Sequence, residues 1–158
     1  MKIHLTFQKA SKHADIPSRS DFYRWVKGAL SVIESPAKTA ELCIRVVDKA
    51  EGAELNQTFR HKSGATNILS FPLLEENTPN DHQTATDIIL GDLVICAPVV
   101  HAEAEAEGKS ALSHWAHLTV HGTLHLLGHI HDTEADASVM EAHEIEILKN
   151  LGCLNPYE

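Results

Sequence analysis

The chain has no long apolar segment and few cysteines, and each absence excludes a class of protein. No run of 18 apolar residues occurs in the 158 residues, so we expect no membrane-spanning helix. The opening stretch, Met1–Gln8, is too short and too polar for a secretory signal. Cys43, Cys96 and Cys153 are odd in number and form no Cys-x2-Cys pair, which predicts free thiols in the reducing cytoplasm.

Basic residues are also scarce relative to acidic ones. Lysine and arginine number 13 against 22 acidic residues, which gives a formal net charge of −9. Because phosphate-driven affinity depends on Lys and Arg, this balance counts against a protein that coats nucleic acid non-specifically. Local recognition stays open, since a metal ion and a few placed arginines can hold one phosphodiester on an acidic protein.

The order of the expected elements predicts an α+β fold. A length of 158 residues with 43% hydrophobic content fits one soluble domain, and we predict a single domain over residues 1–158. Strands and helices alternate through the first two thirds, after which helices dominate, so we expect a mixed sheet of about four strands packed on helices. The expected strands are 3–7, 40–47, 66–71 and part of 88–96, and the expected helices are 20–33, 49–59, 99–107, 110–127 and 133–151.

Polar residues predict where these helices begin. Ser20, Asp48 and Ser110 are expected N-caps, and Thr133 with Asp136 resembles a capping box. Residues 75–87 are polar and predict a loop or an extended hairpin beside the site. In the last helix, Met140, His143, Ile147 and Leu151 share one face, while Glu141, Glu144 and Glu146 lie elsewhere.

The most informative stretch is His121-Gly-Thr-Leu-His125-Leu-Leu-Gly128-His-Ile-His131. Two histidines four apart on a helix lie on one face, about 6 Å apart along the axis, so both can reach one metal ion. Gly128 is expected to end the helix, because glycine readily takes the left-handed conformation, and the reversal can bring His131 back as a third ligand. Three neutral imidazoles leave a fourth position of Zn²⁺ open for water, as in catalytic sites.

One residue separates this motif from the metzincin zinc proteases, which share the spacing His-Glu-x2-His-x2-Gly-x2-His. Gly122 stands where those proteases carry the glutamate that acts as general base. The sequence therefore predicts a metal-dependent hydrolase that does not use the protease mechanism. Two alternatives remain: His129 could replace His131 as a ligand, or it could complete a closed four-histidine site.

The predicted metal helix carries two further histidines on the same side. At 100° per residue, His114, His117, His121 and His125 form one polar stripe on an otherwise apolar helix that we expect to be buried on most sides. For His114 and His117 we expect hydrogen-bonded roles beside the ligands rather than direct ligation.

Five blocks of the sequence together resemble the YbeY-like rRNA maturation proteins, which are bacterial metal-dependent endoribonucleases. The blocks occur in the family's order and cover most of the chain. They are Leu55–Lys62, Thr66–Pro72, Leu90–Leu93, Trp115–His131 and Met140–Ile147.

The resemblance implies a zincin-like α+β fold, a cytoplasmic location and one Zn²⁺ per chain held by His121, His125 and His131. It implies hydrolysis of single-stranded RNA in maturation of the small-subunit rRNA 3′ end and in ribosome quality control, with Arg60 and the three histidines as catalytic residues. The implied partners are ribosomal RNA and the small ribosomal subunit or its proteins, and neither a membrane nor DNA. The family usually has Tyr-Asp before the last histidine, whereas this chain has His129-Ile130, so His129 could act as an extra ligand or proton carrier.

Three further residues are candidates around this site. Arg60 has a planar fork that matches two phosphate oxygens, the alternative being a surface ion pair. Asp92 could orient a ligand histidine or only cap a turn. Phe71, before Pro72, could flank the cleft or simply pack in the core. Two other functions stay open: a metal-dependent hydrolase of another substrate, and a ribosome-associated binding protein whose zinc is structural.

Overall fold

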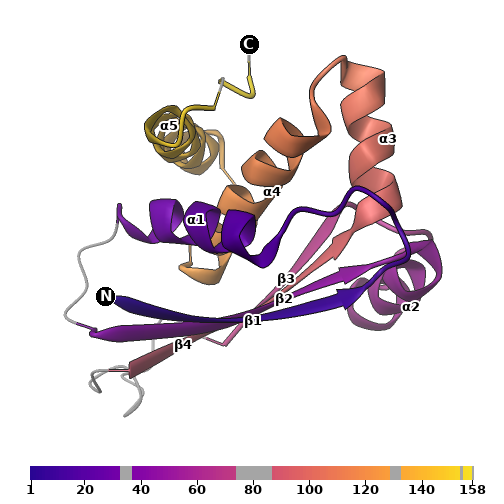
Figure 1. Cartoon of the computed structure of the whole chain (residues 1–158), viewed down its shortest axis with the longest axis horizontal. Coiled ribbons are helices and arrows are strands. Elements are labelled where there is room, and N and C mark those ends of the chain that lie inside the picture. The colour runs from indigo at the N-terminus through magenta and orange to yellow at the C-terminus, as the bar shows by residue number, and fades with distance from the viewer. Residues whose placement is uncertain (33–36, 74–86, 129–132, 154, 158) are drawn as a thin grey trace.

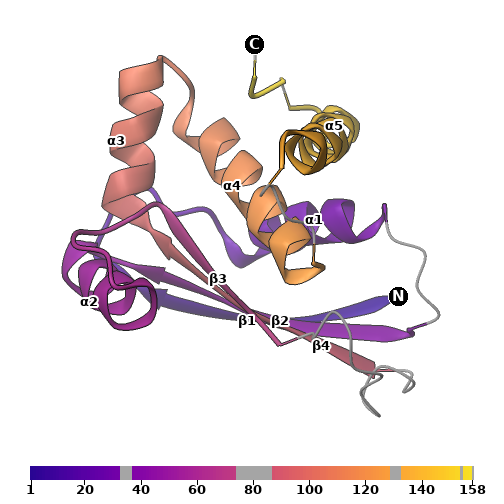
Figure 2. The same ribbon diagram turned by 180° about the vertical axis from the view of Figure 1, so that it is seen from behind.

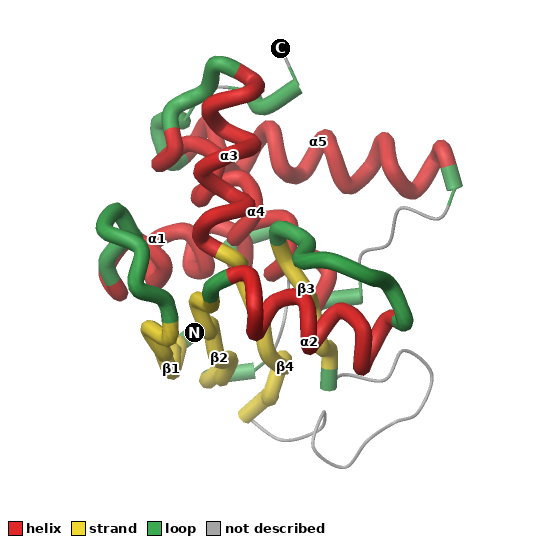
Figure 3. Tube along the Cα trace, turned by 90° about the vertical axis from the view of Figure 1, so that its right-hand side faces the viewer, coloured by secondary structure: helices red, strands yellow, loops and turns green. Residues whose placement is uncertain are grey.

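Four strands form one mixed sheet, as the sequence predicts. The computed structural model describes residues 1–32, 37–73, 87–128, 133–153 and 155–157. Figure 3 shows the strands in the order β1, β2, β4, β3. Strands β1, β2 and β4 are parallel to one another, and β3 runs antiparallel to β4. Their bounds are β1 Lys2–Ala10, β2 Thr39–Val47, β3 Ile68–Pro72 and β4 Asp87–Cys96.

Five helices in the described residues cover the two faces of this sheet unequally. On one face, α1 and α4 pack against the sheet, and α5 packs on α1 and α4 (Figures 1 and 2). The core on this face contains Trp25, Ile44, Leu93 and Trp115. On the other face, α2 closes a smaller core. The bounds are α1 Arg19–Leu30, α2 Lys49–Arg60, α3 Ala97–Glu107, α4 Ala111–Leu126 and α5 Glu134–Asn150.

The N-cap of helix α1 lies two residues earlier than predicted. The N-cap is Ser18, whose hydroxyl accepts a hydrogen bond from the Asp21 backbone N–H, while the Asp21 carboxylate accepts one from the Ser18 N–H. This reciprocal pair satisfies two backbone donors at once, so it outcompetes Ser20, and the Ser20 prediction is wrong. The apolar stripe through Phe22 and Trp25 is buried, as predicted.

Helix α4 is buried on most sides, as its composition predicts, and it lies close against the sheet. The Ser110 hydroxyl caps it by accepting from the Ser113 N–H, and Gly128 follows its end with a φ of 92°. A Cβ atom at Gly122 would lie 2.6 Å from Cδ1 of Ile68 and 2.9 Å from Cδ2 of Leu93. The missing side chain therefore lets α4 approach β3 and β4 closely.

The remaining expectations hold in outline but differ at the ends of elements. Asp48 is the residue before α2, but its carboxylate accepts from Ser11 and Lys12 instead of capping the helix. Thr133 accepts from the Asp136 N–H, which is half of the predicted capping box. Strand β3 begins at residue 68 rather than 66, and most of the predicted loop at 75–87 lies outside the described residues.

Two predicted absences can be compared with the structure. All three cysteines are free thiols, as predicted. No helix in the described part of the chain combines the length and the hydrophobicity that crossing a bilayer requires.

Candidate active site

The four histidines of α4 form a continuous column of rings. The ring centroids lie 6.4 Å apart between His114 and His117, 6.2 Å between His117 and His121, and 4.7 Å between His121 and His125. Residues three and four apart lie on one side of a helix, and that alone produces the column. His114 is hydrogen bonded through Nε2 to the carboxylate of Glu103 on α3, at 3.0 Å, which is the bonded role predicted for it.

His121 and His125 present two nitrogen atoms at a separation that fits metal ligation. Their Nε2 atoms lie 3.1 Å apart. Two imidazole nitrogens on one tetrahedral ion, each about 2.0–2.1 Å from it, would lie about 3.3 Å apart. The pair therefore needs only a small adjustment to share an ion. The predicted third ligand, His131, and its alternative, His129, lie outside the described residues.

A buried carboxylate from α5 supports this pair from behind. The side chain of Glu144 has no exposed surface and accepts hydrogen bonds from Nδ1 of His121, from Nε2 of His117 at 3.4 Å and from the hydroxyl of Tyr157. Burial alone would raise the pKa of Glu144, but these three hydrogen bonds outweigh burial and bring the pKa down to about 2. Glu144 is therefore a carboxylate at neutral pH.

This carboxylate fixes the tautomer of His121. Because the carboxylate only accepts, Nδ1 of His121 carries the proton and Nε2 keeps the lone pair that a metal requires. Metal-ligating histidines in proteins are commonly oriented by a carboxylate in this way. The site thus combines two histidines able to bind a metal ion with a buried carboxylate that determines which nitrogen of His121 keeps the lone pair.

Glu144 corrects one expectation from the sequence. We predicted it away from the apolar face of the last helix, yet it is fully buried on the same side as Met140 and Ile147. The signal was its spacing, four residues after Met140 and three before Ile147, which places it on that face. Its charge concealed this, because an unpaired glutamate is rarely buried.

A second set of residues, which shares His121 with the first, could also hold a metal ion. One ligand atom each from His117, His121 and Glu144 lie within 4.8 Å of one another. His121 is common to both arrangements and also separates two cavities, since it lines a small one with Glu144 and a larger one with His125. Only the pair formed by His121 and His125 faces the larger pocket.

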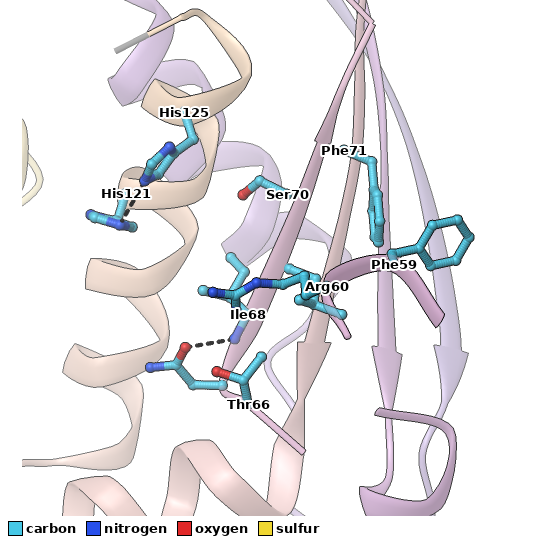
Figure 4. A pocket seen from close by; sticks show the side chains of 10 residues that line it. Phe59, Arg60, Thr66, Ile68, Ser70, Phe71, His121 and His125 are labelled. Carbon is cyan, nitrogen blue, oxygen red and sulfur yellow. Dashed lines mark hydrogen bonds between the residues drawn. The ribbon is translucent and has the colours of Figure 1, made fainter. Parts of the chain in front are cut away.

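The larger pocket brings the predicted arginine and histidines together. It has a volume of about 510 Å³. Figure 4 shows Arg60 reaching from the end of α2 across β3 toward the helix that carries His121 and His125. No acidic side chain lies among the described residues that line it. These are Phe59, Arg60, Thr66, Asn67, Ile68, Leu69, Ser70, Phe71, His121 and His125.

Arg60 is exposed and available in this pocket. It is the last residue of α2, which His61 ends with a left-handed φ of 56°. Within the described segments, its guanidinium makes no hydrogen bond and no ion pair, so the surface ion pair that the sequence left open is not formed there. An unpaired guanidinium fork can bind two oxygens of one phosphate.

Two other sequence candidates have different outcomes. Asp92 lies on the opposite face of β4, where it lines a pocket with Cys43 and Val94, so the prediction that it could orient a ligand histidine is wrong. Phe71 lines the histidine pocket, which agrees with the prediction that it could flank the cleft. Ile68 and Leu93 fill the space that a side chain would need at Gly122, the position of the protease glutamate.

The fold and the site together define a class: an α+β protein in which histidines able to hold a metal ion line a pocket opposite an arginine. The family model described as Endoribonuclease YbeY matches residues 6–152. The chain belongs to this family, which confirms the resemblance drawn from the five sequence blocks.

Individual relatives support the same assignment. The chain is 51% identical over 156 residues to Endoribonuclease YbeY of Methylococcus capsulatus, covering 98% of this chain and 95% of the relative. It is 48% identical over 159 residues to that of Nitrosococcus oceani, covering 100% and 99%. A Thermotoga maritima protein solved in solution shares the fold, with a TM-score of 0.57 and 17% identity over 92% of this chain and 91% of that one.

Proposed function

We propose that this protein is a zinc-dependent endoribonuclease that cleaves single-stranded RNA in the maturation of ribosomal RNA. The observation that carries the proposal is the shared pocket, in which the Arg60 guanidinium and the Nε2 atoms of His121 and His125 face a common space. Family membership supports the same activity, because the relatives bear the name Endoribonuclease YbeY.

Each residue then has a distinct part in the reaction. His121 and His125, with His131 as the predicted third ligand, hold the zinc ion, and Glu144 keeps the proton of His121 on Nδ1. When bound, zinc supplies Lewis acidity and lowers the pKa of water to near 7. Arg60 binds the oxygens of the scissile phosphodiester and offsets the charge that builds up on them.

The lining of the pocket supports a reaction without a carboxylate base. The described lining residues include no Asp or Glu, and residue 122 has no side chain to act as one. Peptide hydrolysis by the metzincin mechanism needs that base, so the pocket favours a substrate with an acidic phosphodiester over a peptide.

We further propose that the protein acts in the cytoplasm on the 3′ end of small-subunit rRNA and on defective ribosomes, with the small ribosomal subunit or its proteins as partners. The net charge of −9 supports a protein partner, because an acidic surface does not itself concentrate RNA. The whole chain, residues 1–158, would act as a single domain.

The test compares the zinc-loaded protein with His125→Ala, purified identically, on end-labelled single-stranded RNA. Cleavage by the first and none by the second is expected. Equal cleavage by both would indicate a contaminating ribonuclease and refute the assignment of this site. If neither cleaves free RNA or the rRNA of small ribosomal subunits, the zinc is structural and the protein is a binding protein. A 2′,3′-cyclic phosphate product would identify attack by the RNA 2′-hydroxyl rather than by water.

A further inference from the structure

Two phenylalanines form an aromatic pair at the boundary between two pockets. Phe59 lies in the last turn of α2, and Phe71 lies near the end of β3. Their ring centroids are 5.1 Å apart and their planes meet at 72°, an edge-to-face contact. Both residues line the histidine pocket, and both also line a second pocket of about 520 Å³ over the other face of the sheet. The pair is thus where the two pockets adjoin.

Phe59 is exposed to a degree that packing does not explain. Its exposed fraction is 59%, whereas Phe22 is fully buried. An edge-to-face contact covers one face of one ring only, so Phe59 keeps an aromatic surface open to solvent. Arg60 follows it directly and lines the same histidine pocket. An exposed ring beside an unpaired guanidinium matches the two parts of a nucleotide, a flat base and an anionic phosphate.

We propose that Phe59, supported by Phe71, stacks an unpaired base of the nucleotide next to the phosphodiester that Arg60 binds, an inference that rests on the proposed function. Aromatic side chains stack any base, because every base has a π face. A base inside a duplex is covered by its neighbours and cannot reach the ring. The platform thereby accounts for selection of single-stranded over double-stranded RNA.

The second pocket supports a base there rather than a phosphate. Its basic residue, Arg45, is engaged by Glu51 through two hydrogen bonds, from Nε at 2.6 Å and from the second terminal nitrogen at 2.9 Å. Asp92 lines the same pocket. A guanidinium already neutralised by a carboxylate is a poor phosphate ligand, so binding beyond the aromatic pair depends on stacking and shape. The path of the strand therefore runs from the histidines across Phe59 into the second pocket.

The experiment measures RNA binding separately from cleavage. In full-length His125→Ala protein, which is not expected to cleave, the affinity for a fluorescent single-stranded oligonucleotide is compared among the parent, Phe59→Leu and Phe59→Tyr. Leucine keeps an apolar contact with Phe71 but has no π face, and tyrosine keeps the face. We expect Phe59→Leu to lose about tenfold in affinity and Phe59→Tyr to bind like the parent.

A matched control and a spectroscopic signal complete the test. Leu112→Ala removes a comparably exposed apolar side chain, 53% exposed, about 14 Å along α4 from His121, and should not change binding. A 2-aminopurine base placed stepwise along the oligonucleotide should be quenched by the parent at one position and not by Phe59→Leu. In the chain with an intact site, Phe59→Leu should raise KM more than it lowers kcat.

The outcomes separate the two proposals. Equal affinity of the parent and Phe59→Leu, with the intact chain cleaving RNA, would overturn the platform and leave the nuclease, and the ring would then belong to a protein contact. Equal losses in Phe59→Leu and Phe59→Tyr would also overturn it, since a stacking role tolerates tyrosine. If the intact chain neither binds nor cleaves single-stranded RNA, the proposed function fails, and the platform fails with it.

Discussion

Replacing Glu144 by glutamine tests whether the buried carboxylate orients His121, one of the proposed metal ligands. The substitution preserves the size of the side chain but removes its charge. The carboxylate accepts from three donors, on His117, His121 and Tyr157. A glutamine has one acceptor oxygen, and its amide nitrogen can only donate, so the three donors cannot all keep their present arrangement. If the amide faces Nδ1 of His121, the ring proton must move to Nε2, where it blocks ligation.

The size of the effect follows from these contacts. A hydrogen bond to a charged group contributes about 1.5–3 kcal/mol, and a buried donor left unpaired costs about 1–3 kcal/mol. We therefore expect the free energy of unfolding of the metal-free protein to fall by about 2–3 kcal/mol with Glu144→Gln. For a chain of this size that lowers the Tm by about 4–12 °C. Loss of the carboxylate behind a ligand histidine also weakens metal binding by about 10–100-fold.

Two assays measure these effects independently. Competition with a chromophoric chelator gives the zinc affinity, and thermal unfolding in the metal-free state gives the stability. Glu146→Gln is the control, because it changes the same residue type on the exposed side of the same helix. If Glu144→Gln binds zinc as tightly as the natural chain, the carboxylate does not orient a ligand. A lower Tm with unchanged zinc affinity would then assign Glu144 a packing role only.

Three other predictions address the phosphate ligand, the helix contact and a surface carboxylate. Arg60→Lys should lower kcat/KM for RNA by at least about tenfold, because lysine cannot make the bidentate contact, and it should leave the Tm unchanged because Arg60 is exposed; unchanged cleavage would contradict its role. Gly122→Ala should lower the Tm by a few degrees, since the cost of overpacking, about 1–3 kcal/mol, exceeds the gain of about 1 kcal/mol in helix propensity. Gly52→Ala is the control and should raise the Tm, because its Cβ would meet its neighbours at 3.5 Å. Equal shifts in the two variants would refute the close contact at Gly122. Hydrogen bonds from Ser11 and Lys12 lower the pKa of Asp48, so the stability that its carboxylate contributes is complete above the unfolded-state pKa and is lost as the pH falls through the folded-state pKa. The difference in Tm between the natural chain and Asp48→Asn should therefore be constant above about pH 5 and should narrow below about pH 4. A difference that widens in acid would contradict the lowered pKa.

The sequence predicted the parts of the fold that depend on local periodicity. The alternation of Ile3, Leu5 and Phe7 marks strand β1, and the spacing of Phe22 and Trp25 marks the buried face of α1. The histidine stripe of α4 follows from helical geometry alone. These features need no knowledge of what packs against them, which is why one sequence suffices.

The features that the sequence did not predict depend on partners far along the chain. Glu144 is stable in the core only because donors from α4 and the C-terminal segment converge on it. The side on which Asp92 lies depends on an irregularity in the pairing of β2 with β4, between Glu41 and Leu42. One extra residue at such a bulge reverses which residues face each side. Strand β4 is also buried on both faces through residues 93–96, so an alternation of apolar and polar residues could not predict which side chains face α4.

The wide separation of the site residues along the chain has a consequence for when the activity arises. Arg60 ends α2, His121 and His125 lie on α4, and the carboxylate comes from α5, so sequence separations of up to 84 residues are closed at one place. During synthesis the chain emerges from its N-terminus, and folding proceeds in that order. A nascent chain that ends before residue 144 carries His121 and His125 but lacks the carboxylate that selects the tautomer of His121. This part of the site is therefore complete only after α5 has been made and has docked on α4.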